Sequence, residues 1–211
     1  MSANRNIYIV GLTGGIASGK SEAAKYLEER GAHCIDADAI YRKLAVAGSP
    51  MLEQIEQVFG SSVILEDGEL NRPALSELIF GNEDNKRLLD GVTHPAIQKA
   101  MMDEVEDAEK NGEQLVFLNV PLLFECGMDV LCDEVWLVSV EEDIQLDRLM
   151  SRDGCTEEQA RARISSQMSL EEKTERATLI IDNNRSIEKM YGELNSAYSS
   201  LVKRVSRMDK E

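Results

Sequence analysis

The sequence predicts an α/β protein: a five-stranded parallel sheet between two layers of helices. Five short runs of residues are apolar at consecutive positions, which is typical of strands buried on both faces. Helical patterns separate these runs, as expected where right-handed crossovers join parallel strands. The predicted strands are residues 6–11, 32–36, 114–119, 134–140 and 178–182.

The first predicted strand leads into a glycine-rich loop, Gly14–Ser21, which matches G-x-x-x-x-G-K-[ST]. Its glycines let backbone N–H groups turn toward phosphate oxygens, and a helix stopped by Gly31 adds the partial positive charge of its N-terminus. Lys20 would reach the β- and γ-phosphates and the Ser21 hydroxyl would hold Mg²⁺, so we expect a nucleoside triphosphate to bind. The residues expected to contact it are Gly15, Ile16, Ala17, Ser18, Gly19, Lys20, Ser21 and Glu22.

Two acidic residues, Asp36 and Asp38, lie at the carboxyl end of the second predicted strand. Ligands collect at the carboxyl ends of strands in an open parallel sheet, so these acids are expected to face the nucleotide. If the strand persists, one carboxylate would orient an attacking hydroxyl and accept its proton, and the other would support Mg²⁺ through water. Alternatively, Asp38 is the N-cap of a helix that starts at Ala39, and both roles can hold at once.

The gap between the second and third strands, residues 37–113, is far longer than one crossover helix needs. It contains no tract rich in proline, glycine or serine, so it indicates an inserted helical subdomain rather than a linker. The helices predicted within it are residues 38–46, 50–59, 73–80, 83–91 and 95–111.

The third predicted strand runs into the segment Pro121–Glu125, with Leu122 and Leu123 at its centre. An apolar stretch after a strand is usually core, and the residues alone favour core over a ligand wall.

A second insertion, residues 141–176, is helical and highly charged, and a helix over 186–205 follows the last strand. We interpret the insertion as a lid over the triphosphate, with Arg148 as its main candidate. The alternative is a solvated helix carrying i,i+4 ion pairs, which is the preferred reading for Arg161 and Arg163. The basic residues of this segment are Arg148, Arg152, Arg161, Arg163, Lys173 and Arg176.

Composition and length disfavour nucleic-acid-binding, zinc-binding and membrane-spanning functions. The chain has 211 residues, one domain in size, and a net charge of −16, which argues against a long nucleic-acid footprint. Four cysteines without a C-x-x-C pair and two histidines are too few for a recognised zinc site, so free thiols are expected. No apolar stretch is long enough to cross a bilayer, so no membrane partner and a cytoplasmic location are expected.

The ordered motifs resemble those of the dephospho-CoA kinase family, a P-loop kinase family, over almost the whole chain. They begin with Gly11–Ser21 and Asp36-Ala37-Asp38, and end with Ile180–Asn183. Between these lie Phe59-Gly60, Asp67–Arg72, Phe80, His94-Pro95, Pro121–Glu125, Gln145–Leu149, Arg152 and Gln167.

The resemblance implies transfer of the γ-phosphoryl group of ATP to the ribose 3′-hydroxyl of dephospho-CoA, with Mg²⁺. It implies that Asp38 orients and deprotonates this hydroxyl, that Arg148 neutralises the transferring charge and that Asn183 lies near the adenine. It also implies a core of residues 1–36 and 112–211, a CoA-binding insertion of residues 37–111 and a lid of residues 141–176. The acceptor-binding residues carried over are Asp38, Arg72, His94, Leu122 and Leu123, with a helix cap as the alternative role for His94.

Four residues depart from the family pattern. Ala17 replaces a glycine, which would cost about 1 kcal/mol if the position needs a positive φ. Glu22 places an acid near the α-phosphate, Asn119 stands where aspartate is common, and Thr178 replaces an acid.

Two other functions are compatible with the phosphate loop: another small-molecule or nucleoside monophosphate kinase of this class, and a nucleotide switch. The switch is disfavoured because neither N-K-x-D nor D-x-x-G occurs in the chain. The residues give no indication of the oligomeric state.

Overall fold

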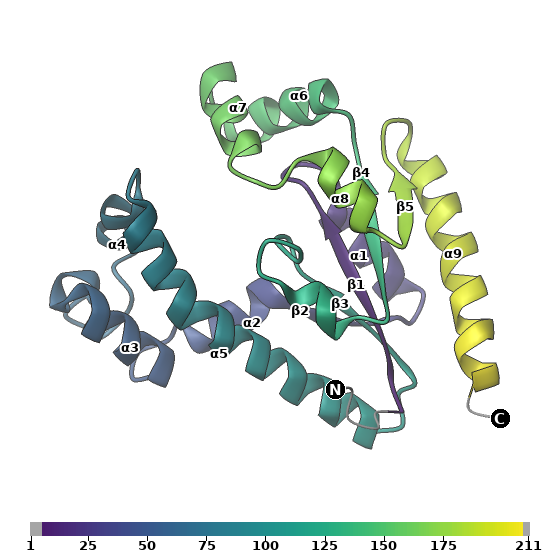
Figure 1. Ribbon diagram of the computed structural model, residues 1–211, viewed down its shortest axis with the longest axis horizontal. Coiled ribbons are helices and arrows are strands. Elements are labelled where there is room, and N and C mark those ends of the chain that lie inside the picture. The colour runs from purple at the N-terminus through teal and green to yellow at the C-terminus, as the bar shows by residue number, and fades with distance from the viewer. Residues whose placement is uncertain (1–5, 209–211) are drawn as a thin grey trace. The chain divides into compact units, whose positions relative to one another are not determined.

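The computed structural model describes residues 6–208 (Figure 1). They form a five-stranded sheet and helices. The strand order is β2-β3-β1-β4-β5, and the β1–β3, β1–β4 and β4–β5 pairs are parallel. The predicted α/β class and five-stranded parallel sheet are therefore confirmed. The strands are β1 (Tyr8–Gly14), β2 (His33–Asp36), β3 (Leu115–Asn119), β4 (Glu134–Ser139) and β5 (Leu179–Asp182).

Strand β1 continues three residues beyond its predicted end. It was expected over residues 6–11, but its ladder extends to Gly14, which is opposite Val138 of β4. The strand is hydrogen-bonded on both sides, and Leu12 is opposite Asn119 of β3. Pairing with two neighbours keeps the backbone extended through residues whose sequence suggested a turn.

The chain divides into two compact units. The first comprises the chain up to Ile35 and from Val105 onward, and the second is Asp36–Glu104. The helices are α1 (Lys20–Glu29), α2 (Ala37–Leu44), α3 (Pro50–Phe59), α4 (Arg72–Ile79), α5 (Glu83–Lys110), α6 (Glu142–Asp153), α7 (Glu157–Ser165), α8 (Leu170–Arg176) and α9 (Ile187–Met208), with short 3₁₀ turns η1 (Ser61–Val63) and η2 (Met128–Leu131).

Helix α5 corrects the expectation of two helices over 83–91 and 95–111. It is continuous over Glu83–Lys110, with Pro95 inside it. Proline removes one N–H, which would have bonded to the Gly91 carbonyl, but a single lost bond does not end a helix held on both sides by packing. Val92 and Ala96, on either side of this point, both pack on the apolar cluster of the second unit.

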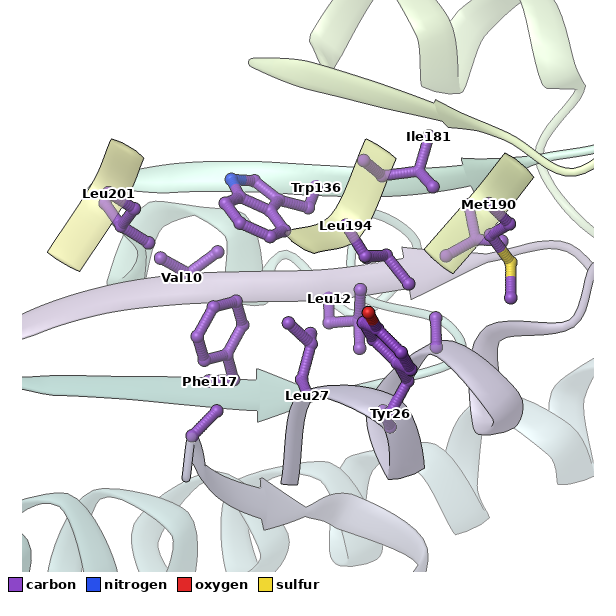
Figure 2. Packing of buried hydrophobic residues seen from close by; sticks show 14 of the residues in the cluster. Val10, Leu12, Tyr26, Leu27, Phe117, Trp136, Ile181, Met190, Leu194 and Leu201 are labelled. Carbon is purple, nitrogen blue, oxygen red and sulfur yellow. The ribbon is translucent and has the colours of Figure 1, made fainter. Parts of the chain in front are cut away.

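The core of the first unit lies between the sheet and helices α1 and α9 (Figure 2). Phe117 of β3 meets Trp136 of β4 edge-on, with ring centroids 5.2 Å apart. Leu27 of α1 and Leu194 of α9 are fully buried in the same cluster. The second unit has its own smaller core, formed by Ala45, Met51, Leu52, Ile55, Val63, Leu70 and Leu75.

Residues 141–176, which we call the lid region, form helices α6, α7 and α8. Gly154, with a φ of 63°, ends α6, and the Thr156 capping box starts α7. Leu149 of α6 and Ala160 of α7 are buried against each other's helix. No helix among residues 6–208 has the length and hydropathy of a membrane span.

Candidate functional site

The glycine-rich loop lies between the end of β1 and the start of α1, as its sequence predicted. Gly19 is the N-cap of α1 with a φ of 92°, in the left-handed region that favours glycine. A Cβ at this position would also lie 2.2 Å from Asn183 Nδ2, so the loop has no room for a side chain here. Gly14 is equally restricted, because a Cβ there would lie 2.8 Å from the Val138 carbonyl oxygen.

Ala17 adopts a φ of 58°, so the condition under which alanine costs the loop about 1 kcal/mol is met. Its methyl group has a compensating contact. Ile16 and Ala17 pack on the apolar cluster of Leu146, Leu149 and Ala160 in the lid region. The loop therefore carries a strained backbone position whose side chain contacts the lid region.

Lys20 is buried, and its Nζ donates a hydrogen bond to Asn119 Oδ1 over 2.5 Å. Asn119 is the last residue of β3, and Lys20 begins α1 after the loop that follows β1, so the pairing of β1 with β3 places the two residues at the same end of the sheet. Because asparagine is neutral, it orients the ammonium group without cancelling its charge. The sequence identified Asn119 as unusual but gave no partner for it.

Arg148, Asn183 and the loop come together although they are far apart in the sequence. Asn183 Nδ2 donates to the Ser18 carbonyl oxygen over 2.7 Å, and Arg148 Nη2 donates to the Asn183 carbonyl oxygen over 3.0 Å. Asn183 is buried, directly after β5. The structure thus joins two predicted nucleotide-binding residues to the phosphate loop.

Ser21 and Glu22 form the first turn of α1 after Lys20. Ser21 is exposed, whereas the Glu22 carboxylate accepts a hydrogen bond from the Tyr191 hydroxyl of α9. This bond raises the pKa of Tyr191 to about 12. Tyr191 stacks on Tyr26 with ring centroids 4.2 Å apart. The Glu22 carboxylate is therefore held by a hydrogen bond to α9.

The two acids of the second unit differ from the expected geometry. The strand ends at Asp36, whose Oδ1 accepts the Ala39 N–H over 2.7 Å as the N-cap of α2. The helix starts at Ala37, so Asp38 is neither a strand residue nor a cap. Its side chain is exposed, and within the described part of the chain its carboxylate accepts no hydrogen bond.

The other residues expected at the acceptor in this unit lie on helices. The Arg72 guanidinium lies over the Tyr41 ring, 5.6 Å from its centroid. His94 lies inside α5 with its Nε2 3.5 Å from Asp90 Oδ1, one turn earlier. The alternative in which His94 caps a helix is therefore wrong, because no helix starts at this point.

Leu122 and Leu123 have different environments. Leu122 is 37% exposed, whereas Leu123 is fully buried. A Cβ on Gly11 would lie 2.7 Å from Leu123 Cδ2, so glycine in β1 makes room for this leucine. Leu123 therefore packs against the sheet in this structure, and only Leu122 presents a surface.

Most basic residues of the lid region form ion pairs. Arg152 Nε lies 2.7 Å from Asp153 Oδ1, and Arg163 Nη1 lies 2.6 Å from Asp153 Oδ2. The hydrogen bonds from Arg152 and then from Arg163 lower the pKa of Asp153 to about 2. Arg161 pairs with Glu157 one turn earlier. Arg161 thus has the i,i+4 pair of the ion-pair interpretation, whereas Arg163 is also paired but with a residue of α6, ten positions earlier.

Two loop contacts were not anticipated. Gln145 and Gln167, both in the lid region, hydrogen-bond to the backbone of Ile16. Both residues belong to the motifs that carry the family resemblance, which was the one signal available in the sequence.

The comparison with protein families decides between the kinases of this fold. The family model described as dephospho-CoA kinase matches residues 8–189. The chain belongs to the dephospho-CoA kinase family. A curated dephospho-CoA kinase from Symbiobacterium thermophilum is 44% identical over 190 residues, which are 90% of this chain and 80% of that protein. A curated dephospho-CoA kinase from Bacillus cereus is 45% identical over 179 residues, which are 85% of this chain and 90% of that protein.

Solved structures agree with this membership. The dephospho-CoA kinase from Campylobacter jejuni has a TM-score of 0.70 at 29% identity and covers 94% of this chain and 98% of its own. The structure of TT1252 from Thermus thermophilus has a TM-score of 0.79 at 32% identity and covers 93% of this chain and 99% of its own. A shikimate kinase from Acinetobacter baumannii, at 15% identity and a TM-score of 0.54, covers 95% of this chain and shares the fold alone. The predicted family, P-loop kinase fold and kinase activity are confirmed.

Proposed function

We propose that this chain transfers the γ-phosphoryl group of ATP to the ribose 3′-hydroxyl of dephospho-CoA, giving CoA and ADP. Its membership of the dephospho-CoA kinase family supports the acceptor. The joining of Arg148 and Asn183 to the phosphate loop supports the donor site. Phosphoryl transfer needs aligned groups and stabilised charge more than covalent chemistry by the protein, and this arrangement supplies both.

On the donor side, Lys20 and the loop amides bind the phosphates, and Arg148 neutralises charge that develops on the transferring group. The N-terminus of the ten-residue helix α1 adds its partial positive charge at the same place. Asn183, which holds the loop through Ser18, lies beside the base in this proposal.

On the acceptor side, Asp38 aligns the hydroxyl and accepts its proton. Its exposed carboxylate, one of the first residues of α2, is available for this role. Arg72, His94 and Leu122 contact the acceptor, and the helical unit Asp36–Glu104 is the CoA-binding part. The lid region closes over the nucleotide, and a cytoplasmic location stays a prediction from the sequence.

The oxygen atoms of Ser21 and Asp36 fit a Mg²⁺ ion whose other ligands come mainly from the bound substrate. Residues 6–208 contain no group of three or more histidine, cysteine or acidic side chains that could enclose a metal. Magnesium binds phosphate oxygens, water and one or two protein oxygens, and the exposed Ser21 hydroxyl is one such ligand. Asp36 would support the ion through water. When bound, the ion would neutralise charge on the β- and γ-phosphates.

A coupled assay of ADP release tests the proposal, with dephospho-CoA offered beside AMP and simple alcohols. We expect ADP release with dephospho-CoA and a product heavier by one phosphoryl group in the mass spectrum. The Lys20→Met variant should abolish turnover, whereas Lys25→Met, on the exposed side of the same helix, should retain it. A preference for AMP or an alcohol would assign the chain to another kinase activity.

A further inference from the structure

Two glutamine side chains hold one residue of the phosphate loop from two segments of the lid region. The Ile16 N–H donates to Gln167 Oε1 over 2.9 Å. Gln145 Nε2 donates to the Ile16 carbonyl oxygen over 2.6 Å. Each amide orientation is fixed by its partner, because an N–H needs an oxygen acceptor and a carbonyl needs a donor.

The loop is shaped to admit Gln145. A Cβ on Gly15 would lie 2.7 Å from Gln145 Nε2, so glycine is needed here for the close approach of this side chain. Gln145 is itself buried, at 8% exposure, on helix α6. Gln145 is therefore a buried amide that reaches a backbone carbonyl through the space that a glycine leaves, so the shape of the loop depends on this contact.

Gln167 is positioned by an ion pair between Glu125 and the buried Lys173. The N–H of the next residue, Met168, donates to Glu125 Oε1 over 3.0 Å. Lys173 Nζ lies 2.9 Å from the same oxygen, and Lys173 is only 1% exposed. Loss of the Glu125 carboxylate would leave the buried Lys173 ammonium uncompensated, so this pair fixes the turn that carries Gln167.

We propose that Gln145 and Gln167 are positioning residues that keep the phosphate loop in its binding shape before ATP arrives. A loop rich in glycine loses much conformational freedom when it binds a ligand, and ordering it in advance reduces that cost. Because Ile16 is held at both its N–H and its carbonyl, the amides that follow it keep their direction. The inference rests on the proposed role of Gly14–Ser21 as the ATP site.

The first test replaces each glutamine by methionine, which has a similar shape and no amide. Losing one hydrogen bond of about 1 kcal/mol predicts about fivefold faster hydrogen exchange of the Ile16 amide in the nucleotide-free protein, followed by NMR. ATP affinity, measured by calorimetry, should fall about fivefold or more for the same reason. Gln57→Met, at an exposed glutamine of α3, is the control and should change neither.

The second test replaces each of the two glutamines, one at a time, by glutamate. Gln167→Glu keeps an acceptor for the Ile16 N–H, so its exchange should stay within about twofold of wild type. Gln145→Glu replaces a donor by an acceptor facing the Ile16 carbonyl, so it should be at least as disruptive as Gln145→Met. Equal effects of the two glutamates on Ile16 exchange would overturn the proposal.

Kinetics separate positioning from mere stabilisation. With dephospho-CoA as acceptor, the methionine variants should raise the KM for ATP and leave the KM for the acceptor unchanged. A lower Tm with unchanged ATP affinity and unchanged Ile16 exchange would reduce the glutamines to packing residues. Exchange and ATP binding need no acceptor, so an enzyme inactive on dephospho-CoA would refute the proposed function without affecting this test.

Discussion

The neutrality of Asn119 offers a direct test of how the loop binds ATP. Asn119→Asp places a carboxylate of the same shape against the Lys20 ammonium, 2.5 Å from Nζ. A phosphate oxygen on the far side of Nζ would be about 3 Å away, so the new charge would lie about 6 Å from it. At an effective dielectric constant of about 20, one unit of charge at that distance repels by about 3 kcal/mol.

We therefore expect Asn119→Asp to weaken ATP binding by roughly 30- to 150-fold, which corresponds to about 2–3 kcal/mol. Titration calorimetry with ATP and Mg²⁺ measures this directly. The control is Asn111→Asp, which adds the same charge at an exposed position after α5. ATP binding equal to or tighter than wild type would refute the reasoning, because the carboxylate would then be supporting the magnesium ion.

Four further changes test other residues. Asp38→Asn should lower kcat by about 10²–10⁴ with ATP affinity unchanged, and turnover within tenfold of wild type would remove Asp38 from the mechanism. Arg148→Ala should lower kcat/KM by at least about tenfold, and an unchanged value would make it a surface residue. Ala17→Gly should raise the free energy of unfolding by about 0.5 kcal/mol by relieving the positive φ, whereas destabilisation in urea titrations would contradict this. Neutral Tyr191, with its pKa raised from 10.0 to about 12, stabilises the fold below pH 10, and this contribution is lost as pH rises through 12. Tyr191→Phe should therefore flatten the loss of stability with pH in this range, and an unchanged slope would exclude the Glu22 contact.

Buried strands were predictable because tertiary pairing and local pattern agree there. Each predicted strand overlaps an observed one. A strand that is apolar at consecutive positions has to be buried on both faces, and a parallel sheet covered by helices provides that environment. Boundaries depend on partners that a local pattern does not contain. β1 continues to Gly14 because Val138 is opposite, and α5 passes Pro95 because apolar residues on both sides pack.

The candidate site was predictable where its chemistry lies in a short motif. The phosphate loop with Lys20 and Ser21 needs only consecutive residues. The contacts that hold this loop join distant segments through single hydrogen bonds, as between Gln167 and Ile16 or Asn119 and Lys20. Nothing in the periodicity of a helix or strand encodes such a contact.

The large sequence separation of these contacts affects the order in which the protein folds. Gln167 is 151 residues beyond Ile16, its partner in the loop, and Asn183 is 165 residues beyond Ser18, its own partner. Tyr191 is 169 residues beyond Glu22. Contacts of such sequence separation form late, after the cost of closing long loops has been met. The phosphate loop is thus completed only after the later segments that carry Gln167, Asn183 and Tyr191 have packed against it, and β1 with α1 alone would lack these contacts.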